Sequence, residues 1–166
     1  MIMTIKKLFL FFIILFISSI TYSDDDCVFN PTAATNPFKK FSENYLSAFW
    51  GDEKKEGYAI SKNKEFLYVK KWSCVRFGMD AKLIVMYSEK SLEDKQYWIE
   101  KALELGKITL DSHEYQFLSN AIKKKSYQEK ISKNEIQIDM TEEPYSEFFV
   151  NIAEKNNMTV VSIYFY

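Results

Sequence analysis

Four aromatic side chains recur at helical spacing near the start of the predicted domain. They follow Asn36-Pro37, a favourable cap with proline at the first helical position, and the pattern stops at Gly51. The four residues are Phe38, Phe41, Tyr45 and Phe49. We therefore expect a first helix between residues 37 and 50.

Three segments rich in aromatic and β-branched residues follow, and this composition is typical of strands. They span residues 58–62, 66–72 and 82–88. The first two are separated only by Asn63, Lys64 and Glu65, so that we expect them to form a hairpin.

Two further helices are predicted in the middle of the chain. Ser91 and Asp94 match a capping pattern before an apolar periodic segment that reaches Gly106. Asp111 and Glu114 repeat the capping pattern, and the helix that they begin ends in the cluster Lys123 to Lys125. Positive charge at that end complements the helix dipole, so we interpret the lysine cluster as a solvated helix end.

The last forty residues return to strand patterns. Strands are predicted at 136–140, 147–153 and 158–165, with Asn156-Asn157 as a turn, whereas the polar stretch 124–134 and Pro144 are expected to be loops. The fold class is therefore α+β: a single domain with an antiparallel sheet of five to six strands and three helices, in the order α-βββ-αα-βββ. We expect the C-terminal strand, 158–166, to be an edge strand.

The first 23 residues have the pattern of a cleavable signal peptide. Lys6 and Lys7 precede an unbroken apolar run, Leu8 to Ile17, and Thr21-Tyr22-Ser23 places small residues at the expected cleavage site. A retained membrane anchor is the alternative, but a helix over residues 8–22 would rise only ~22 Å against a hydrocarbon core of ~30 Å. We therefore expect cleavage near Ser23 and a periplasmic or secreted domain at 24–166, which meets the membrane only during export.

Two cysteines, Cys27 and Cys74, lie in the predicted mature domain. Export would place them where thiols are oxidised, so a Cys27–Cys74 disulfide is expected. A catalytic thiol at Cys74 is the alternative, although a nucleophile with a potential partner cysteine would tend to be capped.

Charge and composition argue against several classes of partner. The whole chain has a formal net charge of −1, and removal of Lys6 and Lys7 would make the domain more acidic, which disfavours nucleic acid. The glycines are scattered, so there is no phosphate-binding loop, and a single histidine with two cysteines does not supply a zinc site. We therefore expect no metal and no cofactor.

Three sets of residues could still carry catalysis. His113 is the only imidazole and would have to be the base of a hydrolase, although a polar surface residue would look the same in sequence. Ser61 and Lys64 have the Ser-x-x-Lys spacing of serine acyltransferases, but they fall in the predicted hairpin turn. Glu142 and Glu143 could form a glycosidase pair, yet adjacent residues at a strand end point to opposite sides.

Aromatic residues are the one feature that exceeds an ordinary composition, and several lie on strands with two apolar faces. Phe66, Tyr68 and Trp72 share one face of a predicted strand, whereas Leu67 and Val69 share the other. If all helices cover one face, the first group would form an open binding surface. If helices cover both faces, these rings belong to the core.

Three hypotheses for function follow from these observations. The first is a non-catalytic binding protein of the cell envelope, not an enzyme, whose partner is another protein; an inhibitor or immunity-type protein belongs to this class. The second is an envelope component that self-associates through the aromatic face or the C-terminal strand. The third is an extracytoplasmic hydrolase that uses His113. The sequence leaves the oligomeric state open.

Overall fold

The structure is a computed structural model that describes residues 35–73, 77–141 and 147–165. The predicted leader, both cysteines and the segment Glu142-Glu143-Pro144 lie outside these ranges. The signal peptide and the disulfide therefore stay predictions. Within the described residues, no helix is long and apolar enough to cross a bilayer.

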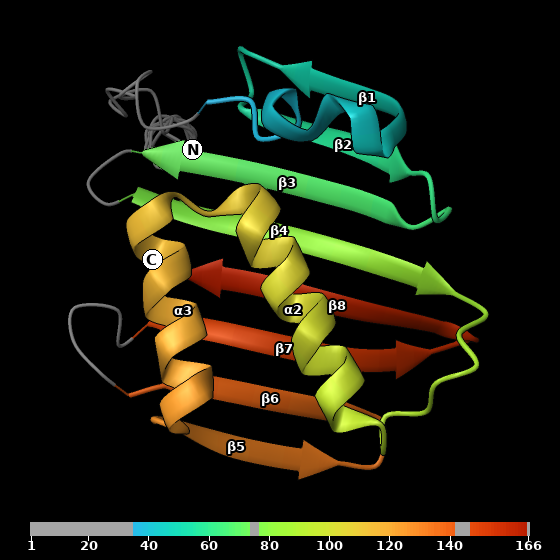
Figure 1. Cartoon of the computed structure of the whole chain (residues 1–166), viewed down its shortest axis with the longest axis vertical. Coiled ribbons are helices and arrows are strands. Elements are labelled where there is room, and N and C mark those ends of the chain that lie inside the picture. The colour runs from blue at the N-terminus through green and yellow to red at the C-terminus, as the bar shows by residue number, and fades with distance from the viewer. Residues whose placement is uncertain (1–34, 74–76, 142–146, 166) are drawn as a thin grey trace, which may run out of the picture.

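The chain forms one antiparallel sheet of eight strands with two α-helices (Figure 1). The first four strands are β1 (Tyr45–Gly51), β2 (Glu56–Ser61), β3 (Phe66–Ser73) and β4 (Phe77–Met86). The helices follow as α2 (Lys95–Thr109) and α3 (Ser112–Lys124). The last four strands are β5 (Tyr127–Ser132), β6 (Glu135–Met140), β7 (Phe148–Lys155) and β8 (Met158–Phe165).

Each group of four strands is a meander, and the two meanders meet in the middle of the sheet. The strand order is β1-β2-β3-β4-β8-β7-β6-β5, so β4 pairs with β8 and the edges are β1 and β5. The predicted fold, with five to six strands and three helices in the order α-βββ-αα-βββ, is therefore wrong. The protein is mostly β, and β8 is a central strand rather than the expected edge.

The predicted first helix is replaced by a short 3-10 helix, η1 (Lys39–Asn44), and by β1. A register shift between Tyr45 and Ser47 in the β1–β2 ladder turns Tyr45 and Phe49 to opposite faces of the sheet. Tyr45 packs against Phe38 with ring centroids 5.6 Å apart, whereas Phe49 is 55% exposed. The four-residue spacing thus arises from a bulged strand that is held by its pairing with β2.

The sequence interpretation also missed β5, which lies in the stretch expected to be a loop. This strand is polar because it is an edge strand with little contact to the core, and its apolar residue Ile131 is 65% exposed. Gln128, Glu129 and Lys130 place polar and charged side chains along it, which is how natural sheets protect an edge from pairing with other chains.

Other local signals are confirmed. The β2–β3 hairpin forms as expected, and Asn156 and Asn157 connect β7 to β8 with φ values of 53° and 61°, the left-handed conformation of a tight hairpin turn. Asp111 caps α3, because its Oδ1 accepts hydrogen bonds from the backbone N–H groups of His113 and Glu114, each at 2.8 Å.

The expected stop of α2 at Gly106 is wrong, since the helix continues to Thr109. Gly106 is buried where α2 approaches α3 and the sheet, and a Cβ there would lie 2.8 Å from Leu118 and 3.4 Å from Ile163. Ser91 and Asp94 do not form the expected capping box either, because the Asp94 side chain makes no capping hydrogen bond.

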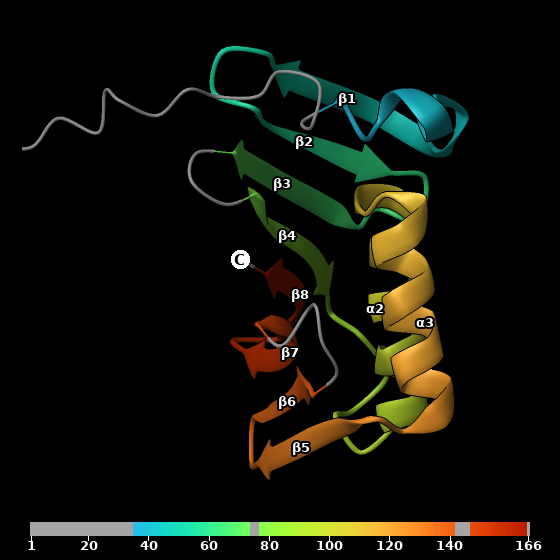
Figure 2. The same cartoon turned by 90° about the vertical axis from the view of Figure 1, so that its left-hand side faces the viewer.

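Both helices lie on the same face of the sheet, as the edge-on view shows (Figure 2). The core fills the space between this face and the helices, and its largest buried side chains include Trp98, Phe148, Leu67, Met79, Leu105 and Leu118. In the described part of the chain, no helix or strand covers the opposite face, which we call the open face. The described residues therefore do not form the alternative arrangement, in which helices cover both faces of the sheet.

Gly57 allows β1 to lie close to β2, and this contact can be tested. A Cβ at Gly57 would collide with the backbone oxygen of Phe49 and would lie 3.1 Å from the Cα of Trp50. We expect Gly57→Ala to lower the free energy of unfolding by about 2 kcal/mol in urea titrations, because β1 must move away. Gly51→Ala is the matched control, since its Cβ would meet the nearest backbone oxygen at 3.4 Å, an ordinary contact. Equal stability of the two variants would contradict this account.

Candidate functional site

The pairing of β1, β2 and β3 brings aromatic side chains together on the open face. Tyr58 lies opposite Phe49 on one side and Tyr68 on the other, and Ile60 lies opposite Phe66. The Phe49 and Tyr58 ring centroids are 5.4 Å apart, and the Tyr58 and Phe66 rings are stacked at 6.2 Å. We call these five residues, Phe49, Tyr58, Ile60, Phe66 and Tyr68, the aromatic patch.

Strand β2 has the reverse of an ordinary burial pattern. Its small residues, Gly57 and Ala59, face the core, whereas Tyr58 and Ile60 are 50% and 39% exposed. Hydrophobic burial normally turns the larger apolar side chains inward, where each stabilises the fold by roughly 1.5–3 kcal/mol. An outward pair of this kind leaves apolar surface that the described fold does not bury, which makes it a candidate binding surface.

Two of the three binding residues predicted from the sequence, Phe66 and Tyr68, lie in the aromatic patch. Trp72 is on the same face but farther along β3, where its ring lies over Gly78 and is partly buried. Sequence analysis missed Phe49, which it placed in a helix. It also missed Tyr58 and Ile60, although their alternation with Gly57 and Ala59 was a visible signal.

The margin of the aromatic patch carries both signs of charge. The Tyr68 hydroxyl donates a hydrogen bond to Glu56 at 3.5 Å, and the Lys82 ammonium lies 5.7 Å from the Tyr68 ring centroid and 2.8 Å from Asp80. Burial, followed by the charges of Glu56 and Asp80, raises the pKa of Tyr68. The site is thus an apolar centre with a mixed polar rim.

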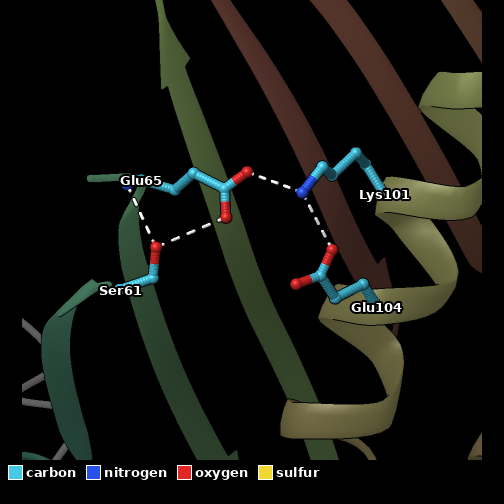
Figure 3. Close-up of polar contacts among 4 residues, drawn as sticks. All are labelled: Ser61, Glu65, Lys101 and Glu104. Atoms are coloured by element: carbon cyan, nitrogen blue, oxygen red, sulfur yellow. Dashed lines mark hydrogen bonds and ion pairs between the residues drawn. The ribbon is translucent and has the colours of Figure 1, made fainter. Parts of the chain in front are cut away.

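A polar cluster on the helix side connects the β2–β3 hairpin to α2 (Figure 3). The Lys101 ammonium donates to Glu65 at 2.6 Å and to Glu104 at 2.9 Å, and Ser61 Oγ accepts a hydrogen bond from the Glu65 backbone N–H at 3.1 Å. Burial lowers the Lys101 pKa, but the hydrogen bonds to Glu65 and Glu104 outweigh it, so that the pKa is raised. The cluster therefore has a structural role, because it links α2 to the β2–β3 hairpin; we call it the Lys101 tie.

The candidate catalytic residues are not brought into a catalytic arrangement. Ser61 bonds to Glu65 rather than to Lys64, which is exposed in the hairpin turn. His113 is exposed in the first turn of α3, where its backbone N–H bonds to Asp111. Among the described residues, no group of three or more His, Cys, Asp or Glu side chains could hold a metal ion. The pair Glu142 and Glu143 lies outside the described ranges.

Described residues line two cavities on the helix side of the sheet, among others. One, of about 280 Å³, is lined by Tyr45, Glu65, Leu67 and Leu105 among others. The other, of about 300 Å³, contains Lys71 and lies beside the start of α3. Burial, followed by the charges of Glu43 and Glu104, raises the pKa of Tyr45 to about 12.

The contribution of the Glu65–Lys101 ion pair to stability can be tested. The two side chains are only 8% and 13% exposed, so Lys101→Met would leave a buried carboxylate without its cation. We expect the free energy of unfolding to fall by about 3 kcal/mol in urea titrations at neutral pH. Lys90→Met, which breaks the exposed pair with Asp94, should cost less than about 1 kcal/mol. Similar losses in the two variants would show that the Lys101 cluster is not a tie.

The Tyr45 hydroxyl is buried and has no hydrogen-bond partner among the described residues. Because its folded pKa is raised from 10.0 to about 12, the unfolded chain loses this proton first, and stability falls as the pH rises above 10. We expect Tyr45→Phe to be near neutral at pH 7 and to become more stable than the unmodified chain by about 1 kcal/mol near pH 11. Urea titrations at both pH values measure the difference, and an equal difference at the two would contradict the assignment.

Comparisons with protein-family models, with curated proteins and with solved structures find no match for this chain. What the chain does is therefore inferred from its own residues. Of the features described above, the aromatic patch is the one that departs most clearly from what the stability of the fold requires.

Proposed function

We propose that this chain is a non-catalytic binding protein that holds a folded partner protein against its open face, centred on the aromatic patch. The observation that carries the proposal is the reversed burial pattern of β2. Tyr58 and Ile60 are exposed on the open face, whereas Gly57 and Ala59 face the core. Exposed rings of this kind are the usual energetic centres of protein interfaces, where a few aromatic residues supply most of the affinity.

The size of the aromatic patch supports a protein partner. Two rings that are half-exposed each offer on the order of 100 Å² of contact area, and the whole patch offers a few hundred. This is the apolar core of an interface that needs about 800 Å² on each partner, and the rest would come from the surrounding polar residues of the open face.

The charges at the rim argue for the same partner class. Glu56 and Asp80 lie beside the aromatic patch, and negative charge here disfavours nucleic acid and anionic lipid. Lys70 lies opposite both Glu56 and Asp80, and Lys82 forms an ion pair with Asp80, so the rim offers both signs for pairing with a protein surface. A protein inhibitor, including one of the immunity type, would bind in this way.

The predicted signal peptide supports the same proposal. The signal-peptide pattern at residues 1–23 would deliver the domain to the periplasm or the exterior, where a Cys27–Cys74 disulfide would stabilise it. A stable exported domain with an open aromatic face is suited to sequestering another protein in that compartment.

Photo-crosslinking tests the proposal directly. A photoreactive phenylalanine at position 58 should crosslink to one discrete partner in envelope or culture fractions of the native source, whereas the same residue in place of Gln116, on the exposed side of α3, should not. With the partner purified, Tyr58→Ser and Phe66→Ser should each weaken binding by about tenfold or more in calorimetry.

The matched control is Ile131→Ser, because Ile131 is as exposed as the aromatic patch but lies on the opposite edge of the sheet. It should leave the affinity unchanged. If the crosslink at position 58 joins two copies of this chain, and light scattering shows a dimer, the face is a self-association surface and the proposed function is wrong. Crosslinks of equal yield from positions 58 and 116 would also overturn it.

A further inference from the structure

Lys71 is a buried cation on the helix side of the sheet. It is only 7% exposed, and among the described residues its ammonium makes no hydrogen bond and no ion pair. The charges that act on it are those of Glu114 and Asp111, at the start of α3. Burial outweighs them and lowers the pKa of Lys71. Burial of an ammonium without a direct partner is costly, so a ligand that supplied a negative group here would stabilise Lys71.

The cavity of about 300 Å³ lies beside Lys71 and has two kinds of wall. Apolar side chains form one part: Pro37, Phe77, Ile108 and Leu110. Polar and charged residues form the other: Thr35, Asn36, Lys40, Lys71, Thr109, Asp111 and Glu114. Its volume is at the lower end of the range for small-molecule sites, and an apolar wall with a few convergent polar groups is their usual composition.

The carboxylates of Asp111 and Glu114 both take part in the capping box of α3. Asp111 Oδ1 accepts two backbone N–H groups, and Glu114 Oε2 accepts the Asp111 N–H at 2.8 Å. A carboxylate has two oxygens and can accept further hydrogen bonds on the other, so each retains capacity for a donor. Glu114 is only 6% exposed, and burial is the main cause that raises its pKa.

The balance of charge decides which class of ligand suits the cavity. Two lysines and two carboxylates line it, so a phosphate or other dianion would meet as much repulsion as attraction. A molecule with one positive and one negative group can satisfy both ends at once. Its carboxylate would supply the missing partner of Lys71, and its ammonium would lie beside the acidic pair.

We propose that this cavity binds a small zwitterion, namely a free α-amino acid with an apolar side chain. The carboxylate accepts from the Lys71 ammonium, the ammonium donates to Glu114 or Asp111, and the side chain packs against the apolar wall formed by Pro37, Phe77, Ile108 and Leu110. The site lies on the helix side of the sheet, so it is separate from the open face and does not depend on the proposed protein partner.

Calorimetry on the full domain with L-leucine as the probe tests this proposal. We expect saturable binding with a Kd of roughly 10 µM to 1 mM, as suits a ligand of this size. N-acetyl-L-leucine lacks the ammonium and isoamylamine lacks the carboxylate, so each should bind at least about tenfold more weakly. These comparisons need no variant and hold even if a substitution disturbs folding.

Two variants assign the binding to Lys71. Lys71→Met should weaken leucine binding by about tenfold or more while the chain still unfolds cooperatively in urea. Lys70→Met is the matched control, because Lys70 neighbours it on β3 but is exposed on the open face, and it should bind leucine as the unmodified chain does.

Three results would overturn the proposal. They are the absence of saturable leucine binding up to about 10 mM, equal affinity for leucine and N-acetyl-L-leucine, which would indicate a simple anion site, and full affinity in a folded Lys71→Met variant. None of them bears on the aromatic patch, so failure here and failure of the proposed function are distinguishable.

Discussion

The antiparallel pairing of β4 with β8 determines the rest of the structure. It joins two four-stranded meanders into one sheet, with Leu83 opposite Val161 and Ala81 opposite Ile163 in its central rows. The connection from β4 to β5 must then cross the sheet, and α2 and α3 make that crossing on one face. Two consecutive helices joined by so short a link cannot be divided between the faces, so the described chain buries one side of its sheet and leaves the other open.

Local chemistry was sufficient to predict the elements that depend on neighbours in sequence. The Asp111–Glu114 capping box, the Asn156-Asn157 turn and the alternation of Ile136, Ile138 and Met140 all formed as expected. The local capping signal at Ser91 and Asp94 failed, and the larger errors occurred where a distant segment determined the outcome. The spacing of Tyr45 and Phe49 matches a helix, but pairing with β2 makes this segment a bulged strand. The segment of β5 was expected to be a loop because an edge strand has few apolar positions.

The candidate site residues likewise fall into those that the sequence identified and those that depend on tertiary contacts. Phe66 and Tyr68 could be identified because strand alternation places them on one face, although which face the helices cover was not determined by alternation. Trp72 shares that face, but its ring rests on Gly78, a contact that requires the β3–β4 register. Lys71 carried no signal in the sequence, because it shares a cavity with Glu114 only through the tertiary fold, which brings the start of α3 near β3.

The strand order of this sheet is the same from either edge, because β1 to β4 correspond in position to β5 to β8. The two halves of the open face nevertheless differ in chemistry. The β1–β3 end presents the aromatic patch, whereas the other half presents one stacked pair of rings, Phe149 and Tyr164, beside a row of amides and a hydroxyl: Gln137, Asn151 and Ser162. A sheet with a balanced strand order therefore has two distinguishable ends on its open face, and a molecule that lies across it would meet different side chains in each of its two orientations.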